Sequence, residues 1–110
     1  MSTKQPELSN TQELIMSVIE FRQLYGLEIS KSISKATDGK RKIPVGSLYP
    51  ILKRLEAKGF VKSEWGETTE AREGARRRYY SLTGAGSSAL AETRAIRAAV
   101  NAYSQNLGGI

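Results

Sequence analysis

The sequence predicts a mostly α-helical fold that carries one two-stranded β-hairpin, and three observations lead to this prediction. Apolar residues recur at helical spacing through the first 58 residues and again near the end of the chain. Between these parts, two short segments rich in aromatic and β-branched residues alternate as strands do. A polar, glycine-flanked segment, residues 66–75, separates the two and is typical of a hairpin tip.

The charge is concentrated in one part of the chain. The 110 residues form one small domain with a formal net charge of +6, which favours either nucleic acid or an acidic membrane surface as partner. Residues 31–62 hold nine cations against two anions, Asp38 and Glu56, so this stretch alone carries +7. The nine cations are Lys31, Lys35, Lys40, Arg41, Lys42, Lys53, Arg54, Lys58 and Lys62.

The composition excludes several kinds of site. The chain contains no cysteine and no histidine, which removes disulfides, the commonest zinc ligands, the usual general base and Cys/His nucleophilic pairs. The glutamates are scattered and accompany no substrate-binding motif, so we expect no enzyme activity, no cofactor and no metal. Apolar runs fall short of the roughly 18 residues that cross a bilayer, and the N-terminus lacks a secretory segment. We therefore expect a cytoplasmic protein.

Two helices are predicted before the basic loop. Ser9 and Gln12 have the spacing of a capping box, and the apolar face that follows predicts a helix from about Asn10 to about Arg22. After a break at residues 24–26, a second helix begins near Gly26 or Leu27 and ends before the turn pair at residues 38–39. Its expected inner stripe is Ile29, Ile33 and Ala36, with Lys31 and Lys35 on the opposite side.

A central helix is predicted over about residues 46–58. We expect Ser47 to cap its N-terminus, Pro50 to fall in its first turn, and Gly59 to end it in a left-handed turn. Leu48, Leu52 and Leu55 then form its buried stripe, and Ser47, Tyr49, Lys53, Arg54 and Lys58 are left for other faces.

The surroundings of this helix indicate what it binds. A helix with one apolar stripe and a basic, hydroxyl-bearing remainder fits a DNA major groove, although a solvated surface helix has the same pattern. Lys40, Arg41 and Lys42 directly precede it, which favours a grip on phosphate over a role in solubility alone. The second helix, the connection and the central helix form a helix-turn-helix whose longer connection is a feature of winged variants.

The hairpin strands are predicted at residues 60–65 and 76–82. A two-stranded hairpin is marginal alone, so we expect Trp65 and one of Tyr79 or Tyr80 to anchor it on the helices. Strand alternation sends Arg77 to one face and Arg76 and Arg78 to the other, which directs at least one arginine toward a DNA backbone or minor groove. In the alternative, the arginines pair with Glu64, Glu67, Glu70 and Glu73 across the hairpin.

A last helix is predicted over about residues 84–105, with Thr83 as its cap. Its apolar and small residues step by four and three, which forms a heptad-like seam. The seam either packs back on the first helix or pairs with a second copy, and we favour a two-fold dimer. The seam residues are Ala89, Thr93, Ile96, Val100, Tyr103 and Leu107.

Four strings of residues resemble the PadR family of transcriptional regulators over residues 14–90. They are YGLEI (25–29), GSLYPILKRLE (46–56), GFV (59–61) and RRYYSLT (77–83), and they are specific in combination. The resemblance implies a winged helix-turn-helix that binds operator DNA as a homodimer, usually as a repressor. It implies that the third helix enters the major groove and that the wing touches the backbone or minor groove. Because this chain has one C-terminal helix, it resembles the short members, in which dimerisation rests on that helix and whatever it packs against.

Together these arguments predict a winged helix-turn-helix DNA-binding domain over residues 9–83 and a C-terminal dimerisation helix over residues 84–107. The alternatives are a winged-helix module that binds an acidic protein, and a ligand-responsive regulator with a pocket at the dimer interface, to which Trp65 and Tyr103 contribute. The glutamate-rich wing argues against deep insertion of its tip into the minor groove. The predicted DNA-binding residues are Lys31, Lys35, Lys40, Arg41, Lys42, Ser47, Tyr49, Lys53, Arg54, Arg72, Arg76, Arg77 and Arg78.

Overall fold

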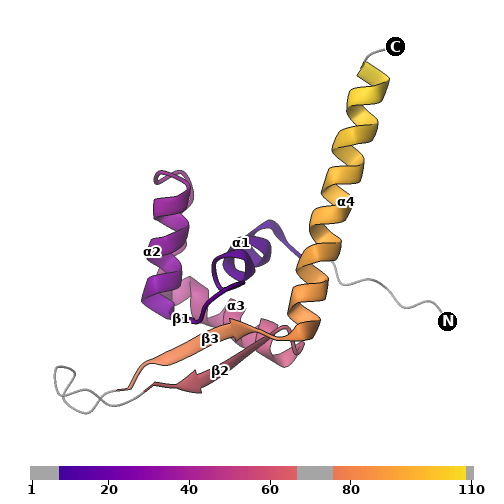
Figure 1. Ribbon diagram of the computed structural model, residues 1–110. Helices are drawn as coiled ribbons and strands as arrows, with labels where there is room; N and C mark the ends of the chain where they lie inside the picture. Colours follow the sequence, from indigo (N-terminus) through magenta and orange to yellow (C-terminus); the bar gives the residue numbers. More distant parts are fainter. Residues whose placement is uncertain (1–7, 67–75, 109–110) are drawn as a thin grey trace.

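The computed structural model of the protein describes residues 8–66 and 76–108. Helices α1, α2 and α3 gather beside a small sheet, and α4 runs away from them as one long helix (Figure 1). The predicted mostly helical class is therefore confirmed. In chain order the elements are α1 (Asn10–Val18), β1 (Leu24–Tyr25), α2 (Gly26–Ala36), α3 (Val45–Ala57), β2 (Val61–Trp65), β3 (Arg78–Leu82) and α4 (Gly84–Gly108).

Helix α1 begins as predicted but ends early. The Gln12 N–H donates to the Ser9 hydroxyl over 3.1 Å and the Ser9 N–H donates to the Gln12 side chain over 2.9 Å, which completes the capping box. The helix stops at Val18, not near Arg22, because the chain must turn so that Leu24 can enter the sheet. One consequence is that Phe21, on this turn, is 91% exposed.

The sheet has a third strand that the sequence analysis missed. The strand order is β1-β3-β2, and both pairings are antiparallel. Strand β1 places Leu24 opposite Tyr80 and Tyr25 opposite Tyr79. Two residues are too short a segment to show a period of two, so the expected two-stranded hairpin is corrected to a three-stranded sheet. The predicted hairpin tip beyond Gly66, with Arg72, Glu67, Glu70 and Glu73, lies outside the described residues.

One core joins all four helices to the sheet. The predicted stripe of Leu48, Leu52 and Leu55 is fully buried, and Ile29 and Ile33 of α2 are buried beside it. Tyr80 is 5% exposed and anchors the sheet as predicted, whereas Trp65 is 53% exposed and does not. Ala36 is exposed because α2 ends there, so it does not belong to the inner stripe.

The start of α3 differs from the prediction. The helix begins at Val45 and Pro44 is its N-cap, so Ser47 lies inside the first turn and makes no cap. The Ser47 and Leu48 N–H groups both donate to the Pro44 carbonyl. Pro50 accordingly falls in the second turn, not the first. The end is as predicted, because Gly59 takes a left-handed φ of 82° that favours glycine.

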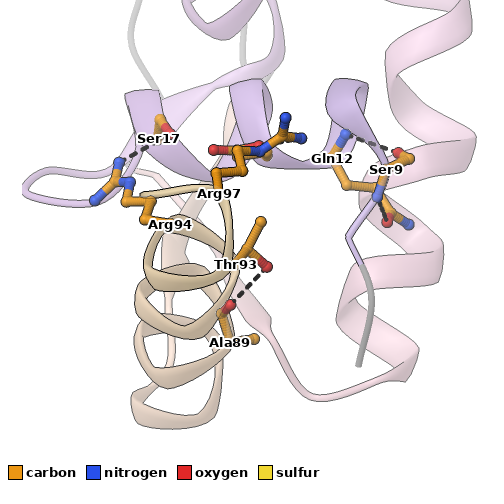
Figure 2. A network of polar contacts seen from close by, with 8 residues as sticks. Ser9, Gln12, Ser17, Ala89, Thr93, Arg94 and Arg97 are labelled. Carbon is orange, nitrogen blue, oxygen red and sulfur yellow. Dashed lines mark hydrogen bonds and ion pairs between the residues drawn. The ribbon is translucent and has the colours of Figure 1, made fainter. Parts of the chain in front are cut away.

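Helix α4 is attached to the body at its beginning and to α1 further along. The Gly86 N–H donates to the Thr83 hydroxyl over 3.0 Å, so Thr83 caps the helix as predicted, and Leu90 is fully buried in the core. Arg97 pairs with Glu13 of α1 and Arg94 pairs with Glu20 just beyond that helix, and Arg94 also donates to Ser17, a bond that Figure 2 shows from close by. The predicted alternative, in which the last helix packs on the first, therefore holds for this part of α4.

In the described part of the chain, none of the helices has both the length and the hydropathy that a membrane crossing requires.

Candidate nucleic-acid interface

The outer face of α3 is formed by the residues that the leucine stripe leaves outside the core. With Leu48, Leu52 and Leu55 buried, Ser47, Lys53 and Arg54 are exposed, as is Lys58 just after the last turn. Ser47 and Arg54 are seven residues apart and therefore lie on one side, two turns from each other. The predicted orientation of these side chains is confirmed, and their contact with DNA stays a prediction.

Tyr49 is placed differently from the other predicted groove residues. Its ring lies against Gly26 at the start of α2, where a Cβ on Gly26 would come within 2.7 Å of the tyrosine Cζ and still closer to its hydroxyl oxygen. Only glycine leaves room for this approach. Tyr49 therefore bridges α3 to the beginning of α2 and remains 44% exposed. Sequence spacing does not reveal such a contact, because the two residues are 23 positions apart.

The basic connection between α2 and α3 holds its cations in two ways. Lys31 and Lys35 on α2, and Lys40 and Lys42 in the connection, are exposed. Arg41 instead turns back toward α1, where its guanidinium donates to the Thr11 hydroxyl over 3.2 Å. We predicted Arg41 to grip phosphate with its neighbours, and in this structure its side chain is partly buried and held by the protein.

Buried polar contacts fix the path of this connection. The Ser30 hydroxyl donates to the Ile43 carbonyl over 2.6 Å, and the Arg41 N–H donates to the Thr37 hydroxyl over 3.0 Å. Ile43 itself is buried in the core. Ile43 is thus tied to α2 and Arg41 to the C-cap of α2, and these bonds help to set the position of α3 relative to α2. The sequence analysis did not assign these hydroxyls a role.

The three consecutive arginines at the base of the hairpin each lie on an aromatic ring. The guanidinium carbons of Arg76 and Arg78 lie 5.8 and 5.0 Å from the Trp65 ring centroid, and that of Arg77 lies 4.3 Å from the Tyr25 centroid. The predicted alternation along the strand is therefore confirmed. Arg78 is also held by a 2.9 Å hydrogen bond to Ser63 and lies 3.8 Å from the Glu56 carboxylate, not beside Glu64.

These residues surround a cavity of about 380 Å³, which we call the wing-base cavity. It joins the start of α2, the outer face of α3 and the sheet end next to the hairpin tip. Within residues 8–66 and 76–108, the charged residues in its lining are all arginines, so this part of the lining is strongly cationic. Its lining residues are Tyr25, Leu27, Tyr49, Trp65, Arg76, Arg77 and Arg78.

The predicted seam of α4 divides into a covered and an uncovered part. Ala89 is 4% exposed and belongs to the core of its own chain. The prediction that Ala89 contacts a partner chain is therefore wrong. The hydroxyl of Thr93, which is partly buried, donates to the Ala89 carbonyl over 2.9 Å. The remaining seam residues are at least half exposed: Ile96, Val100, Tyr103 and Leu107.

The structure does not bring together the residues expected to form a ligand pocket. Trp65 lines the wing-base cavity at the end of β2, whereas Tyr103 lies on the exposed part of α4. Figure 1 places these two segments at opposite ends of the protein. Within residues 8–66 and 76–108, the two side chains of one chain therefore do not line a common pocket.

Comparison with known proteins agrees with this architecture. Residues 15–92 match the model of the transcriptional regulator PadR-like family. A transcriptional regulator from Clostridium thermocellum is 31% identical, with a TM-score of 0.72 over 86% of this chain and 85% of that one. A PadR-like transcription factor from Bacteroides fragilis is 30% identical, with a TM-score of 0.74 over 86% of each chain.

A third structure shares the fold at lower identity. The Bacillus subtilis PadR in complex with operator DNA is 19% identical, with a TM-score of 0.67 over 76% of this chain and 45% of that one. The family match covers more than half of the chain and agrees with the resemblance found in the sequence over residues 14–90. The chain belongs to the PadR-like family of transcriptional regulators.

Proposed function

We propose that the protein represses transcription as a homodimer in which each copy reads one half of a two-fold symmetric operator. The observation that carries the proposal is the exposed face of α3, which lies between exposed cations of the α2–α3 connection and the arginines of the wing-base cavity. Bacillus subtilis PadR, which shares the fold, has been captured with operator DNA. The proposal includes a cytoplasmic location, because such a regulator must reach the DNA.

The parts of this surface have different tasks in the proposal. Ser47, Lys53 and Arg54 on α3 read base edges in the major groove, since arginine and lysine donate well to guanine and hydroxyls to either base type. Lys31, Lys35, Lys40 and Lys42 neutralise phosphates, which adds affinity without sequence information. Half-sites about 34 Å apart fit a two-fold dimer.

Dimerisation is assigned to the uncovered part of α4. Ile96, Val100, Tyr103 and Leu107 repeat along the helix at steps of four, three and four, and all are at least half exposed in one chain. A second copy related by a two-fold axis presents the same stripe, so each helix can cover the other. The outer face of α3 is left free in this arrangement.

The test is selection of the purified protein against a random duplex library at near-physiological salt. Enrichment of a two-fold symmetric motif is the expected result. Binding without enrichment would reduce the protein to a non-specific DNA binder. Absence of binding to any duplex would refute the proposal and favour the alternative of a protein-binding module.

A salt titration of the selected duplex gives a second readout. Because several phosphates are neutralised, the logarithm of the binding constant should fall linearly with the logarithm of salt, by about 0.9 for each phosphate contacted. A slope near zero would contradict the assignment of the lysines to phosphate.

A further inference from the structure

We propose that the wing-base cavity is a preorganised site for one phosphate of the DNA backbone, in which Trp65 and Tyr25 are positioning residues for the arginines. The inference rests on the proposed function and deepens it. From the sequence we predicted that the arginines contact a DNA backbone or minor groove in general terms, and that Trp65 anchors the hairpin on the helices. The cavity has a more specific chemistry.

The aromatic rings hold the guanidinium groups in place. All three guanidinium carbons lie within 6 Å of a ring centroid, the distance range of cation–π attraction, and Trp65 carries two of them. A guanidinium that lies over a ring keeps its N–H groups in its own plane. These groups can therefore still donate hydrogen bonds beyond the edge of the ring. A long arginine side chain normally loses rotamer freedom when it binds, and here much of that cost has already been met in the free protein.

Within residues 8–66 and 76–108, the arginines of the cavity have only one anionic partner, and it lies outside the lining. None of the lining residues in this part of the chain is acidic. The Nε of Arg77 is buried and makes no hydrogen bond within residues 8–66 and 76–108. The nearest carboxylate described is that of Glu56, which reaches Arg78 only at 3.8 Å and from outside the lining. A buried donor without an acceptor is rare in proteins, so it points to an acceptor that arrives with the ligand.

The shape and position of the cavity favour a phosphate over a base. Guanidinium groups already lie over both rings, so a base would have to compete with them for the ring faces. Guanidinium forks match the oxygens of a phosphate, often in pairs. Tyr49 forms the opposite wall and comes from α3, so a duplex that receives α3 in its groove brings its backbone past this opening.

Ser63 and Glu56 support the arrangement from behind. The Ser63 hydroxyl donates to Glu56 over 2.7 Å and accepts from Arg78 over 2.9 Å. Arg78 is thereby connected to α3 through Glu56, the second-to-last residue of that helix. The phosphate site and the base-reading helix are thus built on one polar chain, so that the two contacts are made in a fixed spatial relation.

The first experiment measures duplex affinity and its salt dependence in the full-length protein by fluorescence anisotropy. Arg77→Met should weaken binding to every duplex at least roughly tenfold and reduce the salt slope by about 0.9, the contribution of one phosphate. Trp65→Ala should weaken binding roughly tenfold, and Trp65→Phe should restore most of the affinity because a ring is kept. Lys62→Met is the matched control, since Lys62 is an exposed cation on β2 outside the cavity lining, and it should leave affinity and slope nearly unchanged.

The second experiment locates the phosphate. Single neutral methylphosphonate linkages are scanned along the preferred duplex, and one position should weaken the wild type yet have no further effect on Arg77→Met. If wild type binds DNA but no linkage shows this loss of additivity, or if both cavity variants bind with wild-type affinity and slope, the inference fails while DNA binding stands. If wild type binds no duplex at all, the proposed function fails first.

The third experiment asks whether a free anion occupies the site. Trp65 is the single tryptophan of the chain, so intrinsic fluorescence reports on the cavity directly. Duplex should change the emission with the same midpoint as anisotropy, and millimolar inorganic phosphate should not, compared with chloride at equal ionic strength. A saturable change with inorganic phosphate that competes with duplex would assign the cavity to a free phosphate and overturn the backbone assignment.

Discussion

Replacing Val100 with aspartate should separate the proposed dimer into monomers. Val100 is 60% exposed in one chain, and complete burial of a valine contributes about 1.5–3 kcal/mol, so covering the exposed part contributes about 1–2 kcal/mol. A two-fold axis doubles this contribution. Aspartate removes it and adds the cost of burying two carboxylates, at least about 1 kcal/mol each. A total near 4 kcal/mol corresponds to a roughly thousandfold weaker dimer.

Sedimentation equilibrium over a range of protein concentrations measures this change. The matched control is Asn101→Asp, which adds the same charge to the next position of α4 but lies outside the seam. The control should associate like the wild type. Equal association of Val100→Asp and wild type would refute the assignment of this stripe to the dimer, as would a wild type that is monomeric at every concentration. Because Val100 is exposed in the single chain, thermal unfolding of a dilute sample should differ little between the variants.

Three further predictions concern stability and DNA reading. Gly86→Ala should lower the free energy of unfolding by roughly 1–3 kcal/mol in urea titrations, because the added Cβ would overlap the Phe60 carbonyl. Gly84→Ala is the control, since a Cβ there meets nothing within 4 Å and should not lower the stability. Equal stabilities of the two variants would contradict this prediction. Burial raises the pKa of Tyr80 above its ordinary value of 10.0, although Arg78 opposes the shift. The unfolded chain therefore loses this proton first, so stability present below pH 10.0 should fall as pH rises through the folded pKa, and Tyr80→Phe should remove that part of the alkaline decline. In library selections, Arg54→Ala should change the preferred sequence, whereas Lys40→Ala with Lys42→Ala should weaken all duplexes about equally; a change in preference with the lysine pair would reverse these roles.

The helices were predictable because their buried apolar residues recur at the helical period. Leu48, Leu52 and Leu55 are all fully buried, and the capping box at Ser9 fixed the first helix start to the residue. The end of that helix was not predictable from local pattern, since it depends on the pairing of Leu24 with Tyr80, 56 positions away. Local sequence rules describe residues that are close together along the chain, and Leu24 and Tyr80 are not.

The errors at the candidate site have physical reasons of the same kind. We chose Ser47 as a cap for its hydroxyl, but Pro44 starts α3 with a fixed φ of −60° that needs no side-chain bond. We predicted that Trp65 would anchor the hairpin on the helices because a two-stranded hairpin is marginal alone. Arg78 on the neighbouring strand and Arg76 just before it instead lie over its ring, and this contact depends on the register that pairs Trp65 with Arg78. That the surface is cationic was predictable from the sequence, but the contacts that hold each arginine in place were not.

The division of α4 into a packed beginning and an uncovered remainder makes the two halves of the protein separately adjustable. Leu90 belongs to the core, Arg97 still pairs with Glu13 on α1, and beyond them the helix stands away from the body in Figure 1. Substitutions after Arg97 leave the packing of α1, α2 and α3 untouched. In the proposed dimer, the pairing partner can therefore be changed by exchanging residues 98–108, about three turns of α4, while the proposed base-reading surface on α3 stays unchanged.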